Sequence, residues 1–235
     1  NKTVETGHAL WDLSREVLDS PELLRVFGSV PTKDVLSTLE SLAEAQPFLR
    51  AFHSYLAEYG QRSDLWGMTD PSWIEDPTPA IENLKDHLEH PNRDPRAELA
   101  TLAEERERAV AVALKRLESY PTPVVESFEL HLKAAQKGLV LSEDHGFWID
   151  VAAVYRVRRV FMEIGRRLAV SGVIESADDI FYLRLSELPE MAAAVPKGDR
   201  RAIVSNRKAE LARFELLTPP GSLGTEQGPP PESPL

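Results

Sequence analysis

The sequence contains no cysteine, which excludes disulfide bonds and thiolate chemistry from its stability and its function. It also has no apolar run close to the roughly 18 uninterrupted residues of a membrane-spanning helix. The opening residues, Asn1–Thr6, lack the basic and then apolar order of a secretory signal peptide. We therefore predict a cytoplasmic protein that has no membrane partner.

Basic residues are outnumbered, because 27 lysines and arginines stand against 38 aspartates and glutamates and give a formal net charge of -11. Proteins that bind nucleic acids usually present a basic face, so this balance argues against a nucleic-acid partner. The sequence has neither a Walker phosphate loop nor G-x-G-x-x-G, so we do not expect the chain alone to hold a nucleoside triphosphate. An anionic ligand would need a local basic cluster, and the densest one comprises Arg156, Arg158, Arg159, Arg166 and Arg167.

Helical periodicity, by contrast, is present in nearly every segment before residue 216. Three helix starts are signalled by a capping side chain directly before a helical first turn, at Ser20-Pro21, Thr32-Lys33 and Asp94-Pro95. Glycine predicts two helix ends, one at Gly138 and one at Ser171-Gly172. We predict an all-α fold, an irregular bundle of many helices.

Two segments lack this periodicity. Gln61 to Thr78 collects Gly, Pro, Asp and Trp, and we predict a long ordered loop there because its two tryptophans can bury a large area. Residues 218–235 are rich in Pro, Gly and Ser, which is the composition of a flexible linker. The predicted organisation is a helical domain over residues 1–217 followed by this linker, as in one module of a larger protein.

The most informative helix begins near Phe147 and carries charged residues on its apolar side. An advance of about 100° per residue from Phe147 defines one apolar stripe, on which Asp150 and Arg158 also fall. These two residues lie about 12 Å apart along a helix, so they cannot pair directly. Each needs another partner or a ligand, because an unpaired buried charge is strongly unfavourable. The stripe comprises Phe147, Val151, Val154, Val157, Phe161, Ile164, Gly165 and Leu168.

Other candidate side chains have two interpretations each. His145 precedes this helix and is either a general base or hydroxyl-binding group, or it makes a hydrogen bond at the helix entry. Arg62, in the long loop, either supports a ligand or pairs with a core carboxylate. Asp178 and Asp179 would suit magnesium, but acidic pairs at a helix junction are usually solvated caps, so we predict no metal site.

Six fragments of the sequence occur in a characteristic order. They are Leu56–Ser63, Pro71–Pro77, Glu143–Asp150, Val157–Leu168, Asp178–Leu183 and Asn206–Glu210. Together they resemble the helical middle region of phosphoenolpyruvate-synthase-like phosphotransferases, with the rifampicin phosphotransferases as the most similar type. The resemblance covers most of residues 7 to 222, and Gln61 departs from it because a more basic or aromatic side chain is expected there.

The resemblance implies a division of labour among domains. An ATP-binding domain phosphorylates a histidine on a swivelling domain, which carries the phosphoryl group to a helical acceptor domain similar to this chain. The expected ligand is a hydroxylated, hydrophobic small molecule, and the expected partners are the ATP-binding and phosphohistidine domains, in cis or in trans. We expect no cofactor in this domain, ATP and Mg²⁺ in the full-length enzyme, and no turnover by this chain alone.

The resemblance also leads us to assign roles to residues. Arg158 matches the first of the family's paired arginines and is expected to contact the phosphoryl group, with Arg159 as its substitute if the helix phase differs by one position. His145 and Asp144 are expected to orient the acceptor hydroxyl or to take its proton. The residues predicted to bind the substrate are Arg62, Trp66, Asp144, Phe147, Trp148, Asp150, Val154 and Tyr155.

Two other functions are compatible with the sequence. A non-catalytic helical module would bind an acidic partner protein through its arginine cluster, and its arginines would be solvated around a filled core. A self-contained helical enzyme would use magnesium with Asp178 and Asp179, and it would need a facing set of acidic residues. A cavity lined by Phe147, Val154 and Arg158 would favour the phosphotransferase instead.

Overall fold

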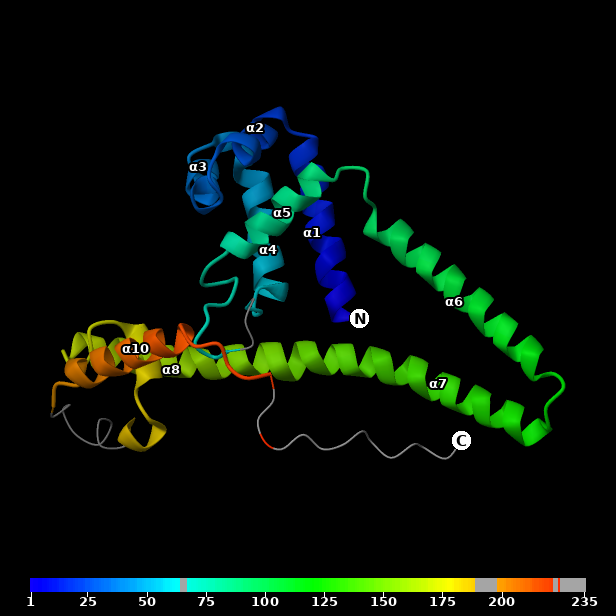
Figure 1. Ribbon diagram of the computed structural model, residues 1–235. Helices are drawn as coiled ribbons and strands as arrows, with labels where there is room; N and C mark the ends of the chain where they lie inside the picture. Colours follow the sequence, from blue (N-terminus) through cyan, green and yellow to red (C-terminus); the bar gives the residue numbers. More distant parts are fainter. Residues whose placement is uncertain (64–66, 189–197, 222–223, 225–235) are drawn as a thin grey trace. The chain divides into compact units, whose positions relative to one another are not determined.

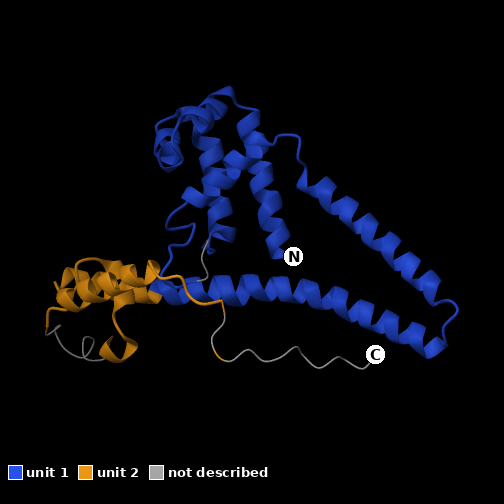
Figure 2. Ribbon diagram, in the orientation of Figure 1, with its two compact units in different colours: residues 1–159 blue, residues 160–235 orange. Residues whose placement is uncertain are grey.

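The computed structural model describes residues 1–63, 67–188, 198–221 and 224 (Figure 1). Every regular element in these ranges is a helix, which confirms the predicted all-α class. The chain divides into two compact units, residues 1–159 and 160–235 (Figure 2). No helix in the described ranges is long and apolar enough to cross a membrane.

The first unit is built from helices whose starts follow the local sequence. The Ser20 side chain accepts a hydrogen bond from the backbone of Leu23, as predicted. Asp94 caps the helix that begins at Pro95 in the same way, also as predicted. Thr32 differs, because it lies inside a short 3₁₀ helix and makes no capping bond. The elements are α1 (Lys2–Leu18), α2 (Pro21–Ser29), η1 (Thr32–Asp34), α3 (Val35–Glu40), η2 (Ala43–Ala45), α4 (Gln46–Tyr59), α5 (Thr78–Glu89), α6 (Pro95–Leu117), α7 (Thr122–His145), η3 (Gly146–Ala153) and the start of α8 (Val154–Val170).

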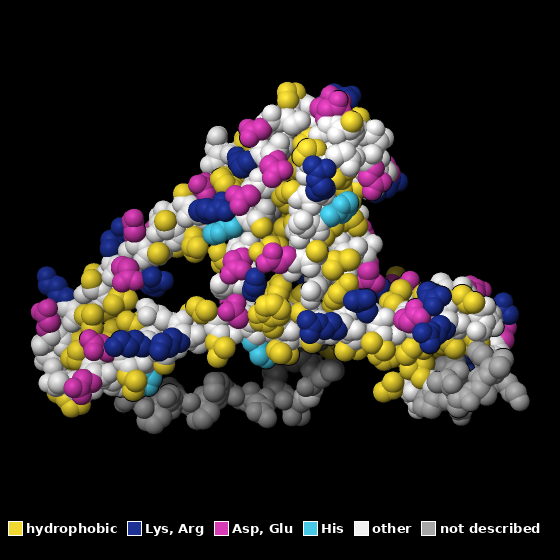
Figure 3. All heavy atoms as spheres, turned by 180° about the vertical axis from the view of Figure 1, so that it is seen from behind, with side chains coloured by type: hydrophobic (Ala, Val, Ile, Leu, Met, Phe, Trp, Pro, Cys, Tyr) yellow, Lys and Arg dark blue, Asp and Glu magenta, His cyan; other side chains and the backbone are white. Residues whose placement is uncertain are grey.

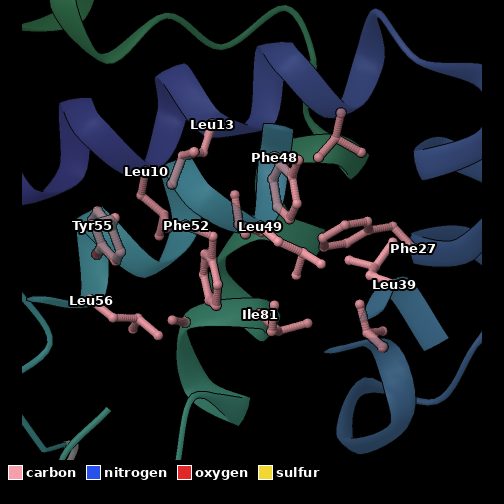
Figure 4. Packing of buried hydrophobic residues seen from close by; sticks show 14 of the residues in the cluster. Leu10, Leu13, Phe27, Leu39, Phe48, Leu49, Phe52, Tyr55, Leu56 and Ile81 are labelled. Atoms are coloured by element: carbon pink, nitrogen blue, oxygen red, sulfur yellow. The ribbon is translucent and has the colours of Figure 1, made fainter. Parts of the chain in front are cut away.

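The core of this unit lies among α1 to α5, as Figure 4 shows. Phe48 and Phe52, one turn apart on α4, stack with ring centroids 5.9 Å apart, and Phe27 of α2 meets Phe48 edge to face. Burial of each such ring stabilises the fold by roughly 1.5 to 3 kcal/mol. This core fixes the end of α4, from which the long loop at residues 60–77 departs.

The predicted helix end at Gly138 is wrong, because α7 continues through it to His145. Glycine ends a helix when it adopts a positive φ, and Gly138 does not, whereas Gly172 has a φ of 73° and follows the end of α8 as predicted. The extra length of α7 carries His145 to the candidate site.

The second unit contains the rest of α8, η4 (Ala177–Tyr182), η5 (Leu185–Glu187) and α10 (Arg201–Glu215). The aromatic run at residues 179–183 lies in the 3₁₀ helix η4 as far as Tyr182, and Leu183 follows as its C-cap. The core of this unit comprises Leu168, Val173, Ile174, Ile180 and Val204. Residues 218–221 and 224 are exposed, and the rest of the predicted linker lies outside the described residues.

Candidate functional site

The candidate site is organised by η3, a π-helix in the wider i→i+5 hydrogen-bonding pattern that is rare and often marks functional sites. It links α7 to α8 without a break in the chain direction. In this pattern the backbone hydrogen bonds join residues five apart. His145 and Asp150 are five apart, and His145 Nδ1 lies 3.8 Å from Asp150 Oδ2.

Two members of the predicted apolar stripe are more exposed than expected. Val157 was expected on the buried stripe but is 46% exposed, whereas Arg158 is only 4% exposed. Asp150 was expected on that stripe too, yet 45% of its side chain is exposed. The other predicted members of the stripe beyond η3 are buried or half-buried, so the predicted phase holds there; they are Arg158, Phe161, Ile164, Gly165 and Leu168.

A cavity of about 720 Å³ lies against η3 within the first unit. Its wall combines apolar side chains from η3 and α8 with hydroxyl groups and charged side chains from α1, α7 and the long loop. This mixture suits a ligand that has both an apolar part and several hydrogen-bonding groups. The lining residues are Thr3, Thr6, Gln61, Arg62, Ser63, Gly67, Asp70, Ser72, Ser142, Glu143, His145, Gly146, Phe147, Asp150, Val151, Val154, Tyr155 and Arg158.

Arg158 turns inward and holds the long loop. Its Nε donates to both carboxylate oxygens of Glu75 at 3.0 Å, and its Nη1 donates to the backbone oxygens of Met68 and Thr69, also at 3.0 Å. The predicted need for a partner of Arg158 is thereby confirmed. The pairing joins residues far apart in the sequence, so it fixes the loop against α8.

The Glu75 carboxylate is held in its charged form. Burial would raise its pKa, but hydrogen bonds from Arg158 and Ser72 outweigh burial and lower that pKa below the ordinary value of 4.5. Glu75 was not among the site residues predicted from the sequence. The sequence pattern that could have indicated Glu75 is Ser72-x-x-Glu75, the spacing of a capping box. In the structure Glu75 accepts hydrogen bonds from the backbone and the hydroxyl of Ser72.

Arg62, on the opposite arm of the loop, has a different environment. Its guanidinium lies 4.7 Å from the ring centroid of Trp73, which is 4% exposed. The two arms of the loop are joined by backbone hydrogen bonds from Trp73 N to Arg62 O at 2.8 Å and from Ile74 N to Gly60 O at 3.0 Å. A Cβ at Gly60 would lie 2.5 Å from Leu56 O, so this close approach requires glycine.

The structure gathers most of the predicted site residues at the cavity and places others elsewhere. Asp144 accepts a hydrogen bond from the backbone of Lys2 at the start of α1 and does not line the cavity. Trp148 is 50% exposed and meets Phe147 edge to face. Arg159 is exposed, with its guanidinium 5.9 Å from the Tyr155 ring centroid. Trp66 lies outside the described residues. Those that line the cavity are Arg62, His145, Phe147, Asp150, Val154, Tyr155 and Arg158.

In the acidic pair considered for magnesium, the Asp179 carboxylate accepts hydrogen bonds from the protein itself. Asp179, 1% exposed, accepts from the backbones of Glu175 and Ser176, from the Ser176 hydroxyl and from Lys208. In the part of the chain that the structure describes, no group of three or more His, Asp or Glu side chains could hold a metal ion. The facing acidic set that the magnesium alternative needs is therefore not found there.

The charged surface agrees with the composition. In the view of Figure 3, acidic and basic side chains are interspersed and no broad face carries basic residues alone. On α8, Arg166 and Arg167 both pair with Glu163, and those hydrogen bonds lower the pKa of the Glu163 carboxyl to about 2. Two members of the arginine cluster therefore share one carboxylate within their own helix.

Comparison with known proteins finds relatives along nearly the whole chain. A chondramide synthase of Chondromyces crocatus is 37% identical over 96% of this chain and 6% of its own length. An uncharacterized phosphotransferase of Bacillus subtilis is 28% identical over 96% of this chain and 27% of its own length. A rifampicin phosphotransferase of Streptomyces sviceus is 25% identical over 96% of this chain and 26% of its own length. The chain therefore spans about a quarter of these phosphotransferases.

The family comparison agrees with the fold and with the sequence resemblance. The family described as rifampicin phosphotransferase fourth domain matches residues 1–143, from α1 almost to the end of α7. The match includes the loop arms that carry Arg62 and Glu75, and it stops just before η3. With more than half of its residues matched, this chain belongs to the rifampicin phosphotransferase fourth-domain family.

Proposed function

We propose that this chain is the acceptor-binding domain of an ATP-dependent, dikinase-type phosphotransferase. The observation that carries the proposal is the cavity of about 720 Å³, where His145, Asp150 and two arginines meet an apolar wall. Its size falls within the roughly 300 to 1,000 Å³ of small-molecule sites. Membership of the phosphotransferase family supports the reaction class. The cytoplasm, where ATP is available, is the compartment that this proposal implies.

The proposed reaction moves a phosphoryl group from a phosphohistidine on another domain. The acceptor hydroxyl oxygen bonds to phosphorus while the donor P–N bond breaks, and the electron pair of that bond stays on the donor imidazole. His145 takes the hydroxyl proton. Because Asp150 lies at its Nδ1, Nε2 is the nitrogen that accepts the proton. Such a transfer depends on positioning and positive charge, and arginine side chains line the cavity.

The proposed acceptor is a hydroxylated small molecule with a substantial hydrophobic part. Phe147, Val151, Val154 and Tyr155 form an apolar wall for that part, and hydroxyl and amide groups around the cavity can bond its polar edge. ATP and Mg²⁺ would act on the other domains of the full-length enzyme, and this domain would need no cofactor of its own.

Ligand binding can be tested by obstructing the cavity. Val154 lines it, whereas Val157, three residues further along α8, is exposed and does not. We expect hydrophobic hydroxylated compounds to raise the melting temperature of the wild type and of Val157→Phe, but not of Val154→Phe. A library without any stabilising compound, or equal stabilisation of both variants, would count against the acceptor site.

Catalysis can be tested by supplying the missing reaction partners. With an ATP-binding domain and a phosphohistidine domain in cis or in trans, the chain should support acceptor-dependent ATP consumption. His145→Gln should then lower kcat on the order of 10²-fold, because it removes the general base. ATP turnover by the isolated chain, or an unchanged kcat for His145→Gln, would overturn this assignment.

The alternative of a module that binds an acidic partner has weaker support. Arg156 and Arg159 are exposed, but Arg166 and Arg167 share Glu163 and Arg158 is buried against Glu75. A partner protein would therefore meet fewer available cations than the sequence cluster indicates. Binding of an acidic peptide that Arg156→Gln or Arg159→Gln abolishes would favour this alternative.

A further inference from the structure

The two arginines that line the cavity differ in what compensates their charge. Arg158 is 4% exposed and pairs with Glu75, which neutralises it, while two backbone oxygens accept from its Nη1. Its guanidinium already has anionic and neutral acceptors from the loop. A ligand that took over these bonds would release the loop from α8, so Arg158 is suited to positioning.

Arg62 has the opposite character. Its guanidinium stacks on Trp73, and among the residues that the structure describes no carboxylate forms an ion pair with it. A stacked guanidinium keeps its N–H donors in the plane of the fork and directs them at the edge, where a phosphoryl oxygen can accept two parallel bonds. Its charge is therefore available at the cavity wall.

The position of Arg62 is fixed before any ligand arrives. Backbone bonds from Trp73 to Arg62 and from Ile74 to Gly60 join the two arms of the loop, and Glu75 anchors the second arm to Arg158. A cation held in this way loses little conformational entropy when it binds an anion. Arg158 thus acts on Arg62 indirectly, because it holds the loop that carries Arg62.

We infer that Arg62 is the cavity cation that contacts the phosphoryl group, and that Arg158 is a positioning residue that holds the Arg62 loop. Identifying the anion as a phosphoryl group rests on the proposed function. Asp70, Glu143 and Asp150 also line the cavity and disfavour an anion near them.

Titration with inorganic phosphate tests this assignment without turnover or an acceptor. The arginine Nε–Hε resonances of a ¹⁵N-labelled chain would be followed by NMR at constant ionic strength, with sodium chloride as the reference and Arg62→Lys and Arg158→Lys used for assignment. We expect a saturable shift for Arg62 alone. In Arg62→Lys, phosphate affinity should fall about tenfold or more, because the planar fork is lost.

Arg159→Lys is the matched control, because Arg159 also stacks on an aromatic ring but does not line the cavity. It should leave phosphate affinity unchanged. A shift of Arg158 with Arg62 unchanged, an equal response to chloride, or no saturable shift would each overturn the inference. Acceptor-induced melting shifts report separately on the proposed function. If they persist while phosphate fails to bind at Arg62, the acceptor site stands and only this assignment falls.

Discussion

The two units contain buried charged pairs of opposite design. In the first unit the cation Arg158 is buried, and its acid, Glu75, has 29% of its side chain exposed. In the second unit the acid Asp179 is buried, and its cation, Lys208, has 44% of its side chain exposed. The first pair lies at the cavity, whereas the second closes a turn. A charge on an apolar face therefore does not by itself predict a ligand site.

The difference follows from what each buried group needs. A carboxylate accepts hydrogen bonds, and the backbone N–H groups of its own turn, at Glu175 and Ser176, satisfy Asp179 locally. A guanidinium only donates, so Arg158 requires acceptors, which arrive from a loop about 83 residues away in the sequence. Non-local satisfaction draws that loop to α8 and positions it at the cavity.

Removing Arg158 should break this comparison most strongly. Arg158→Met leaves two loop carbonyls without this donor and Glu75 with only its bonds from Ser72, and we expect a loss of about 3 kcal/mol of unfolding free energy because one partner of a buried pair remains. Urea unfolding of the chain measures it. Glu75→Gln keeps an acceptor for the guanidinium and is the milder control. Equal, negligible losses in both variants would show that the pair does not hold the loop.

Glycines sharpen the contrast between the units. A Cβ at Gly165 would lie 2.1 Å from Ala177 O, so Gly165→Ala must displace backbone in the second unit and should cost about 2 to 3 kcal/mol. Gly138, inside α7 of the first unit, has open space at this position, so Gly138→Ala should stabilise by up to about 1 kcal/mol. Thermal unfolding of the two variants gives both values. The same sign for both would contradict this account.

The second pair should respond mainly to loss of its acid. Asp179→Ala leaves the N–H groups of Glu175 and Ser176 without an acceptor, and we expect a loss of about 2 kcal/mol. Lys208→Met should cost less than about 1 kcal/mol, because an exposed lysine contributes little. Neither variant should change phosphate or acceptor binding at the cavity. A larger loss from Lys208→Met than from Asp179→Ala would reverse this ranking.

Acid should begin to weaken the two pairs at different pH values. Burial would raise the pKa of both carboxyl groups, but the hydrogen bonds that they accept outweigh burial. The pKa of Glu75 is therefore lowered from 4.5 and that of Asp179 from 3.8. A lowered folded pKa gives stability that is complete above the unfolded value and is lost as pH falls through the folded value. The Glu75 contribution should therefore begin to decline below 4.5, and that of Asp179 below 3.8.

This smallest effect, about 1 kcal/mol or less, can be measured as the difference in urea midpoint between about pH 5 and about pH 4. The wild type should lose more stability over this interval than Glu75→Gln, which has no carboxyl to protonate. Identical pH dependence of the two proteins would exclude Glu75 as the titrating group.

Much of the local structure was predictable because its causes are local. The caps at Ser20 and Asp94 and the end of α8 before Gly172 follow from side-chain hydrogen bonds and from glycine conformation. The error at Gly138 shows the limit of that reasoning. Glycine permits a helix to end without requiring it, and the continuing helix satisfies the backbone equally well.

The sequence by itself determined the all-α class, the loop after α4 and the need for a partner of Arg158, since these depend on periodicity and on the cost of an unpaired buried charge. Only the tertiary structure decided that Glu75 is this partner and that Asp150 lies beside His145. It also decided that His145, Asp150 and Arg158 line one cavity. The reason is physical: a π-helical turn and a contact across the chain both change which side chains meet, without leaving a fixed spacing in the sequence.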